Sequence, residues 1–356
     1  MNPHEVPVMQ ASPHWSDAIH NRLSKIWQAG QFSNFGPQVR ELEELFAQKM
    51  QVSPSQVVSV TNATLGLAGA LQTSGMPRWL VPSWTFAATV HAAVLARVKV
   101  SLVDVREDTW MNSHIGKNPA DSGVLLVLPF GAGLADFNWG DDQDVVIDAA
   151  ASITAKFPSL SNLPKKSSVV FSLHATKVLG AGEGGVVVFG TEAAARRFRQ
   201  WTNFGFDSRR ESALVGLNAK MSEITAACNI VQLENWDRII QEWAAARATM
   251  ETMASSVGIE VFSPVNGGSG PYFIALFSGH DERNMVEKFL HDGGVETRRW
   301  WGAGCHKMPA FLHLPREALF ETERVSGRYL GLPLFPGLAP QHVRMIEQLF
   351  RANLAK

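Results

Sequence analysis

The stretch FSLHATKVLGAGEGGVVVFG, residues 171–190, places Lys177 between two apolar runs. Runs of this length and composition predict buried strands, so the lysine is expected in the loop that leaves the first strand. In open α/β sheets, ligands bind at the carboxyl ends of the strands, where such loops begin. An amine at this place predicts a chemical role, although a solvated loop lysine would show the same pattern.

Apolar runs of strand length alternate with helical patterns over the first two-thirds of the chain. Strands that are apolar on both faces are typical of a mostly parallel sheet covered by helices. We therefore expect an α/β fold with a mostly parallel seven-stranded sheet flanked by helices. The predicted strands cover residues 57–60, 78–83, 99–105, 123–130, 144–149, 168–173 and 184–190.

A second, smaller unit is expected after these strands. The helical pattern at 222–258 predicts one or two linking helices that end at a glycine. An apolar run at 271–277 and helical patterns at 281–294 and 340–354 then predict a small α+β domain.

Chain length fits two domains, because 356 residues with 46% hydrophobic content can bury a large core. The expected large domain covers residues 1–240 and begins with two amphipathic helices joined by the loop GQFSNFGP (30–37). The expected small C-terminal domain covers residues 241–356.

Charge and cysteine content narrow the class of protein. The formal net charge is −1 and basic residues are dispersed, which predicts no nucleic-acid or membrane partner and favours a small-molecule ligand. Cys228 and Cys305 lack metal-ligand spacing, so neither a disulfide scaffold nor a metal site is expected. The sequence has no signal-peptide pattern and no run of about 18 apolar residues, which predicts a cytoplasmic protein.

Several polar residues end predicted strands and are expected to meet at one edge of the sheet. Asp148 closes DVVI, Ser172 and Lys177 follow VVF, and TNAT (61–64) opens a helix. Free backbone N–H groups and a threonine hydroxyl at a helix N-terminus can bind a phosphate. Taken singly, each feature has an ordinary explanation as a helix cap, an ion pair or a surface lysine.

Together, these residues meet the needs of pyridoxal 5'-phosphate. This cofactor requires a lysine to hold its aldehyde as an imine, a carboxylate beside its ring nitrogen, a phosphate site and an aromatic face. Phe86 in VPSWTFAATV would supply the aromatic face, although a core phenylalanine fits the same pattern.

The ordered motifs resemble a known family, the DegT/DnrJ/StrS aminotransferases. These pyridoxal-phosphate enzymes act on nucleotide-linked keto sugars and have the aspartate-aminotransferase fold (fold type I). Ordered matches over roughly residues 30 to 350 are far more specific than one glycine-rich loop. The resemblance is carried by NFGPQVRELEELFA, TNATLGLAGAL, VPSWTFAATVHA, VSLVDVREDTWMN, LPFGAGLADFNW, VVIDAAAS, FSLHATKVLGAGEGGVVV, NFGFDSRRESALVGLNAKMSEITAA, HKMPAF and LPLFPGL.

The resemblance implies a role for each matched residue around the cofactor. Lys177 matches the Schiff-base lysine, Asp148 the aspartate that pairs with the pyridine nitrogen, and Phe86 the aromatic residue that stacks on the ring. The cofactor phosphate would be bound by Ala63, Thr64 and Ser172.

Further matches concern the second subunit and the substrate. Asn218 resembles a residue that reaches the phosphate of the neighbouring subunit's cofactor, which implies a homodimer with shared active sites. Lys220 and His306 match residues near the nucleotide-sugar. Two positions depart from the family pattern: Ala151 replaces a Gln or His that reaches the cofactor's phenolic oxygen, and Leu173 replaces an aromatic residue.

The resemblance implies transamination from L-glutamate, through pyridoxamine 5'-phosphate, to a nucleotide-linked keto-deoxy sugar. The expected nucleotide is dTDP, and the amino sugar would serve polysaccharide or natural-product biosynthesis. Lys177 would be the base that acts on the donor's α-carbon. Asp148 would keep the ring nitrogen protonated.

Two alternatives stay open. One is a sugar dehydratase on the same fold, although such relatives replace the lysine by histidine. The other is a non-catalytic regulatory relative, which would not need the matched set of site residues. The donor carboxylate has four candidate partners, and substrate recognition is expected in loops 33–38, 203–216 and 298–309. The four candidates are Arg209, Arg210, Arg298 and Arg299.

Overall fold

The computed structural model describes residues 5–11, 13–14, 17–116, 121–134, 143–157, 160 and 164–354. The first residues of the predicted N-terminal helix, Trp15 and Ser16, and the end of the motif LPFGAGLADFNW, beyond Leu134, lie outside the described residues.

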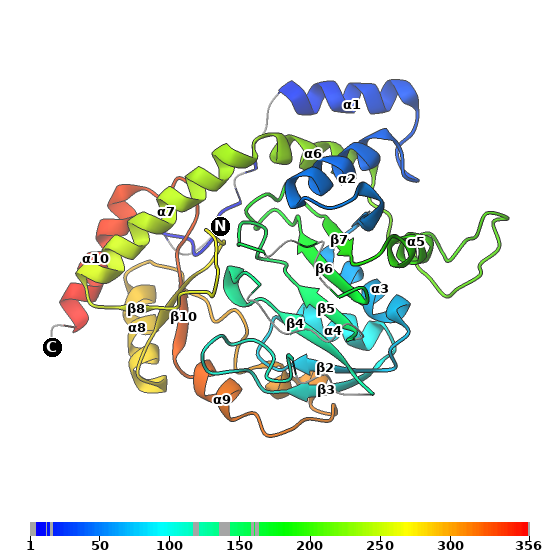
Figure 1. The fold of residues 1–356 in the computed structure, drawn as a ribbon. Helices are drawn as coiled ribbons and strands as arrows, with labels where there is room; N and C mark the ends of the chain where they lie inside the picture. Colours follow the sequence, from blue (N-terminus) through cyan, green and yellow to red (C-terminus); the bar gives the residue numbers. More distant parts are fainter. Residues whose placement is uncertain are drawn as a thin grey trace.

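A seven-stranded sheet forms the centre of the molecule, in the order β1-β7-β6-β5-β4-β2-β3 (Figure 1). Strand β7 is antiparallel to both its neighbours, and every other neighbouring pair is parallel. The predicted mostly parallel sheet is therefore confirmed. The strands are β1 (Val57–Val60), β2 (Arg78–Pro82), β3 (Lys99–Val103), β4 (Gly123–Val127), β5 (Val145–Asp148), β6 (Ser167–Ser172) and β7 (Gly185–Phe189).

The antiparallel direction of β7 follows from the short segment before it. Only residues 173–184 separate β6 from β7, and no helix lies between them. A parallel connection usually crosses over through a helix, and this segment has none, so the pair forms a hairpin-like unit instead. Lys177 lies in that connection, at the carboxyl end of β6.

Helices cover both faces of the sheet, and successive strand residues point to opposite sides. In β6, Val169 and Phe171 belong to one buried cluster, whereas Val170 belongs to the other. Helices α3 (Ala63–Ser74), α4 (Ala87–Leu95) and α5 (Glu192–Trp201) contribute buried residues to the second cluster. On the first face lie α2 (Pro37–Met50) and α6 (Glu223–Glu234).

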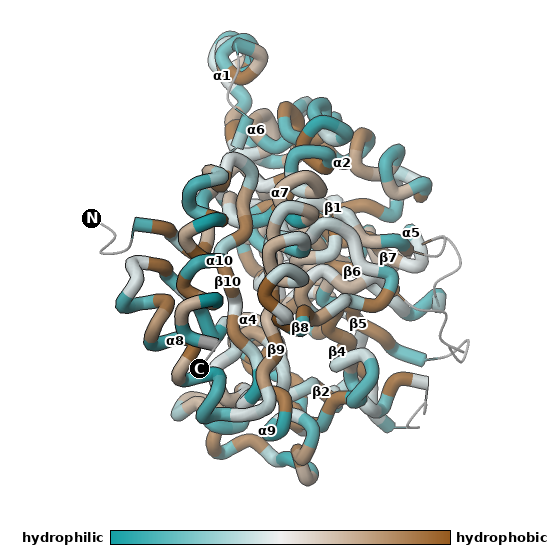
Figure 2. The backbone as a smooth tube through the Cα atoms, turned by 90° about the vertical axis from the view of Figure 1, so that its left-hand side faces the viewer, coloured by the Kyte–Doolittle hydropathy of each residue, from teal (hydrophilic) through white to brown (hydrophobic). Residues whose placement is uncertain are grey.

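The N-terminus of α2 is fixed by a buried carboxylate. Glu223, at the start of α6, accepts hydrogen bonds from the backbone N–H groups of Gln38 (2.7 Å) and Val39 (3.3 Å), the first turn of α2. A negative charge at a helix N-terminus is stabilised by the free N–H groups and the helix dipole. Helix α1 (Asp17–Ala29) lies at the periphery, beside α6 (Figures 1 and 2).

The pattern at 222–258 forms two helices, α6 and the long α7 (Trp236–Ser256), and Gly258 follows with a positive φ of 73°. Beyond α7 lies a three-stranded antiparallel sheet in the order β10-β9-β8. Its strands are β8 (Glu260–Val261), β9 (Phe273–Leu276) and β10 (Tyr329–Leu332). The accompanying helices are α8 (His280–Asp292), α9 (Phe320–Ser326) and α10 (Pro340–Leu354).

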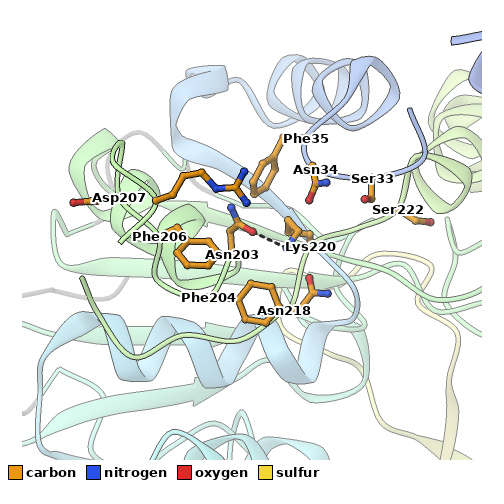
Figure 3. Close-up of a pocket in the computed structure, with 11 residues that line it drawn as sticks. Ser33, Asn34, Phe35, Asn203, Phe204, Phe206, Asp207, Asn218, Lys220 and Ser222 are labelled. Carbon is orange, nitrogen blue, oxygen red and sulfur yellow. Dashed lines mark hydrogen bonds between the residues drawn. The ribbon is translucent and has the colours of Figure 1, made fainter. Parts of the chain in front are cut away.

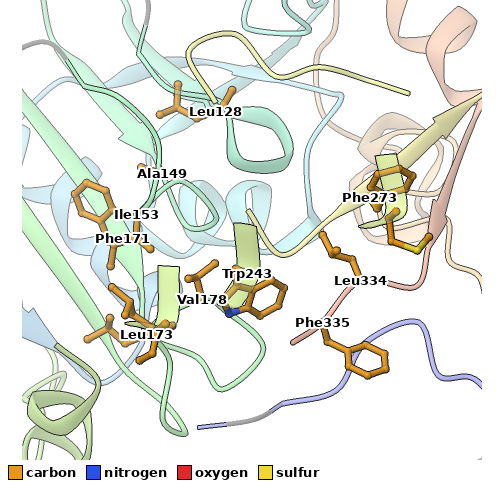
Figure 4. Packing of buried hydrophobic residues seen from close by; sticks show 14 of the residues in the cluster. Leu128, Ala149, Ile153, Phe171, Leu173, Val178, Trp243, Phe273, Leu334 and Phe335 are labelled. Atoms are coloured by element: carbon orange, nitrogen blue, oxygen red, sulfur yellow. The ribbon is translucent and has the colours of Figure 1, made fainter. Parts of the chain in front are cut away.

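One buried cluster joins the two sheets. It runs from Phe171 on β6 through Trp243 on α7 to Phe273 on β9 (Figure 4). The N-terminal segment joins the same region, because Val6 forms a parallel bridge with Val295. The domain boundary at residue 240 stays a prediction, and that residue lies inside α7.

Within the part of the chain that the structure describes, no helix is both long and apolar enough to cross a membrane. The same residues include no group of three or more His, Cys, Asp or Glu side chains that could hold a metal ion.

Candidate active site

A cavity of about 770 Å³ lies at the carboxyl ends of the central strands. Its polar residues come from different strands and from the helices that follow them, as the topology of a parallel sheet requires. Six of the sequence-predicted site residues line this cavity: Ala63, Thr64, Phe86, Asp148, Ser172 and Lys177.

Lys177 is half-buried and held by a tight turn. Its backbone N–H donates to the carbonyl of His174 at 2.8 Å, and the N–H of Gly180 donates to the carbonyl of Lys177 at 3.0 Å. A Cβ atom at Gly180 would lie 1.8 Å from the oxygen of His174, so only glycine fits there. Lys177 Nζ donates a 2.5 Å hydrogen bond to the hydroxyl of Tyr272.

Asp148 ends β5 as a buried carboxylate with two hydrogen-bond donors. Thr89 Oγ1 donates to one oxygen at 2.7 Å, and the backbone N–H of Ala150 donates to the other at 3.1 Å. Burial raises the pKa of Asp148, and the two hydrogen bonds and the positive charge of Lys177 oppose that rise. A positive charge placed in the cavity would favour the ionised carboxylate further.

The start of α3 forms an anion site at the cavity wall. The Asn62 side chain accepts from the N–H of Leu65 at 3.0 Å, while the N–H groups of Ala63 and Thr64 have no intrahelical acceptor. Ser172 Oγ accepts from the N–H of His174 at 3.2 Å, which leaves its own hydrogen for an acceptor in the cavity. These donors suit a phosphate.

Phe86 precedes α4 and is 56% exposed at the cavity, an unusual state for a residue so apolar. Its ring is thus available to cover a flat ligand. An amine, a buried carboxylate, a phosphate site and an exposed aromatic face therefore meet in one cavity. This donor set fits pyridoxal phosphate, with Lys177 at the aldehyde and Asp148 at the ring nitrogen.

Two predicted residues lie in a different place on the same chain. Asn218 and Lys220 line a second cavity of about 750 Å³, together with Asn203 and Phe204 (Figure 3). Lys220 Nζ donates to Asn203 Oδ1 at 2.7 Å and lies 4.9 Å from the centre of the Phe204 ring. Burial lowers the pKa of Lys220.

His306 does not line either cavity. It is 2% exposed, and its Nδ1 lies 2.7 Å from the hydroxyl of Ser83, which also accepts from the backbone N–H of His306 at 3.1 Å. Burial lowers the pKa of His306. Its predicted position beside a nucleotide-sugar remains a prediction.

The structure adds cavity residues that sequence reasoning missed. Thr89 lies one helical turn after Phe86, a spacing that could have indicated it. The others were not named individually: two lie in the predicted recognition loop 298–309, and two lie in the connection before β7 or just before β9, where no local pattern marks them. They are Glu183, Tyr272, Trp300 and Trp301.

The four candidate arginines lie in different surroundings. Arg298 lines the main cavity, whereas Arg299 forms an ion pair with Glu287 outside it. Arg209 pairs with Asp207 at 3.3 Å, and Arg210 lines the second cavity.

Comparisons with known proteins identify the family of this chain. Residues 13–350 match the model of the DegT/DnrJ/EryC1/StrS aminotransferase family. Protein Rv3402c of Mycobacterium tuberculosis is 27% identical, covering 96% of this chain and 88% of the relative. The dTDP-4-amino-4,6-dideoxy-D-glucose transaminase of Shigella dysenteriae is 28% identical, covering 92% of this chain and 94% of the relative.

A solved structure extends the likeness to three dimensions. DesI, crystallised in the presence of its TDP-sugar product, has a TM-score of 0.84 and is 27% identical, covering 99% of this chain and 93% of DesI. The expected fold of pyridoxal-phosphate-dependent transferases is therefore confirmed. The chain belongs to the DegT/DnrJ/EryC1/StrS family and is an aminotransferase that depends on pyridoxal phosphate.

Proposed function

We propose that this enzyme transfers the amino group of L-glutamate to a keto group on a nucleotide-linked deoxy sugar, with dTDP as the nucleotide. The observation that carries the proposal is the meeting of Lys177 and Asp148 in one cavity large enough for a cofactor and part of a substrate. Two relatives support the nucleotide: the Shigella transaminase is named for a dTDP-sugar, and DesI was crystallised in the presence of its TDP-sugar product. Such a product would enter polysaccharide synthesis, including O-antigen and lipopolysaccharide, or natural-product synthesis.

Four residues of the cavity have defined parts in this chemistry. Bound pyridoxal phosphate supplies the electron sink that makes the donor's α-carbon acidic. Lys177 Nζ would take up the proton from that carbon and return it to the carbon of the cofactor's aldehyde group. The Asp148 carboxylate holds a proton at the ring nitrogen, and the N–H groups of Ala63 and Thr64 bind the phosphate.

We assign the donor carboxylate to Arg298. Its guanidinium lies 4.9 Å from the centre of the Trp300 ring and donates to Glu296 at 2.6 Å, while the side chain remains exposed at the cavity. A planar guanidinium can bind a carboxylate through two parallel hydrogen bonds. The other three arginines lack a place in this cavity.

A homodimer with shared active sites completes the proposal. Apolar side chains are exposed near the cavity that holds Asn218 and Lys220, and a second copy of the chain would cover them. In that arrangement Asn218 would donate to the phosphate bound by the partner. The exposed apolar residues are Phe32, Phe204, Val215, Leu217 and Ile224.

The test is an absorption spectrum of the cofactor-loaded protein before and after excess L-glutamate. A visible band that moves to the shorter wavelength of the pyridoxamine form would establish the donor half-reaction. Keto sugars linked to dTDP, GDP and UDP should then restore the visible band, dTDP best. A band that glutamate leaves unchanged would contradict the donor, and restoration by other nucleotides alone would contradict the dTDP assignment.

A further inference from the structure

The hydroxyl of Tyr272 contacts the amine of Lys177, the reacting nitrogen of the proposed mechanism. We infer that Tyr272 is a further catalytic residue, whose hydroxyl orients the Lys177 amine and stabilises its protonated form. The 2.5 Å hydrogen bond is the only one that Nζ makes among the described residues. The inference rests on the proposed role of Lys177, because the tyrosine acts on that amine and on no substrate atom.

Tyr272 reaches the cavity because two backbone segments approach each other closely. A Cβ atom at Gly270 would lie 3.2 Å from both the Cα of Gly131 and the oxygen of Phe130, and Gly131 itself has a φ of 94°. A side chain at either position would make a tight contact with the facing backbone, and the positive φ of Gly131 favours glycine there. The contact places the start of β9, and Tyr272 with it, against the loop that follows β4.

Side-chain contacts then fix the ring of Tyr272. Its centre lies 5.6 Å from that of Phe130 and 4.9 Å from that of Trp300, both at steep interplanar angles of 77° and 70°. Arg247 on α7 donates to the backbone carbonyl of Tyr272 at 3.0 Å. With its ring held from two sides, the hydroxyl has little freedom, so it holds the amine in a defined place.

A phenol suits this task because it can accept or donate a hydrogen bond. It accepts from the ammonium of Lys177, as the structure shows, and it can donate to the neutral amine. A hydrogen bond to a charged group contributes more than one between neutral groups. Removal of the hydroxyl should therefore destabilise the protonated nitrogen and lower the pH at which it loses its proton.

Other ionisable groups line the same cavity. They are Asp148 at the end of β5, His174 and Glu183 on the connection between β6 and β7, and Arg298. Among the described residues, none of these four donates or accepts a hydrogen bond at Nζ, and Asp148 and Lys177 interact through their charges. A single substitution at Tyr272 leaves all four unchanged, which isolates the effect of the hydroxyl.

The experiment is a pH titration of the visible absorption of the cofactor-loaded protein, which follows the proton on the Lys177 nitrogen. Tyr272→Phe is compared to wild type. Phenylalanine keeps the ring contacts and removes only the oxygen. We expect the titration midpoint to fall by about one pH unit, on the scale of one hydrogen bond to a charged group. We also expect kcat to fall about tenfold or more, with the KM for glutamate within about threefold.

The matched control is Tyr329→Phe, the same substitution at the only other tyrosine of the chain. The Tyr329 hydroxyl accepts from the backbone N–H of Trp301 at 2.8 Å rather than from Lys177. The titration midpoint of Tyr329→Phe should equal that of wild type. An unshifted midpoint for Tyr272→Phe, or equal shifts in both variants, would overturn the inference.

The titration needs neither an amino donor nor a sugar, so its result is separate from that of the proposed function. A shifted midpoint in a protein that rejects glutamate would support the role of Tyr272 and contradict the donor. A wild-type protein that binds pyridoxal phosphate without any visible band would overturn both the role of Lys177 and this inference.

Discussion

The hydroxyl of Thr89 donates a 2.7 Å hydrogen bond to the carboxylate of Asp148. Thr89 lies in the first turn of α4, a helix that begins directly after Phe86, so one helix end positions both the aromatic face and the carboxylate. A second hydroxyl, that of Thr85, lies 2.8 Å from Thr89 Oγ1 and extends the network. The carboxylate is thus held in place before any cation reaches it.

This buried carboxylate should destabilise the cofactor-free protein. Burial raises the pKa of Asp148 above its ordinary value of 3.8, so folding opposes its ionisation. Below that ordinary value the group is protonated in both states and costs nothing; as the pH rises through the raised pKa, stability is lost. Asp148→Asn should therefore raise the free energy of unfolding of the cofactor-free protein by about 0.5–2 kcal/mol near neutral pH.

Chemical denaturation at several pH values checks this prediction. The increase in the free energy of unfolding that Asp148→Asn causes should shrink toward zero as the pH falls toward 4. Cofactor affinity and transamination should be strongly reduced at every pH. Asp144→Asn, at the other end of β5, serves as the comparison. A gain that is independent of pH would show that the charge of Asp148 is not its cause.

Removal of the Lys177 amine should abolish transamination while leaving the phosphate site intact. Lys177→Ala is expected to lower the rate by about 10⁴-fold or more, since the proposed base is lost. The variant should still bind pyridoxal phosphate through Thr64 and Ser172, without the visible band. Rate measurements beside Lys165→Ala, whose lysine lines a separate cavity, test the assignment. Turnover close to wild type would remove Lys177 from the mechanism.

Most of the sheet and the centre of the site could be predicted from the sequence. The run at 57–60 coincides with β1, and the run at 168–173 lies one residue from β6, because strands buried on both faces have continuous apolar runs. Asp148 and Lys177 meet because parallel strands end at one edge. This rule requires only the positions of the strands in the sequence, which the apolar runs predict.

The remaining cavity residues depend on tertiary contacts that no local pattern encodes. Tyr272 lies 95 residues after Lys177 and reaches it through the close approach of two loops. His306 also depends on packing: the structure places its ring against Ser83 in the interior, and its role near the nucleotide-sugar stays a prediction. A motif fixes the position of a residue in the chain, whereas packing fixes the direction of its side chain.

That packing gives His306 a testable structural role. Residues Cys305 and His306 bind the loop before Phe86: Cys305 donates from its N–H to the Ser83 carbonyl at 2.8 Å and from Sγ to the Thr85 carbonyl at 3.3 Å. His306→Ala should lower the free energy of unfolding by about 1–3 kcal/mol, because the buried Ser83 hydroxyl loses its partner. It should also weaken cofactor binding, since Phe86 follows this loop.

The pH dependence separates this role from simple loss of volume. Burial lowers the pKa of His306 below its ordinary value of 6.5, so the unfolded chain binds a proton there more readily. The contribution of the neutral His306 ring to the free energy of unfolding is complete above pH 6.5. It is lost as the pH falls through 6.5 toward the lowered pKa. Urea denaturation at pH 8 and pH 5 should therefore show a smaller difference between wild type and His306→Ala at pH 5. An equal difference at both values would contradict the neutral state of the ring.

Shared active sites predict that two inactive variants restore each other. Lys177→Ala removes the amine of its own site, while Asn218→Asp places a negative charge where the partner's phosphate is proposed to bind. A mixed dimer would contain one doubly altered site and one intact site, as two-fold symmetry requires. Co-refolding equal amounts should give about a quarter of wild-type activity, because about half of the dimers are mixed and each has one working site.

The control is Lys177→Ala mixed with Asp148→Asn. Each of these changes inactivates the cavity of its own chain, so the mixed dimer keeps no intact site. Equal activity in both mixtures would show that Asn218 serves no second subunit.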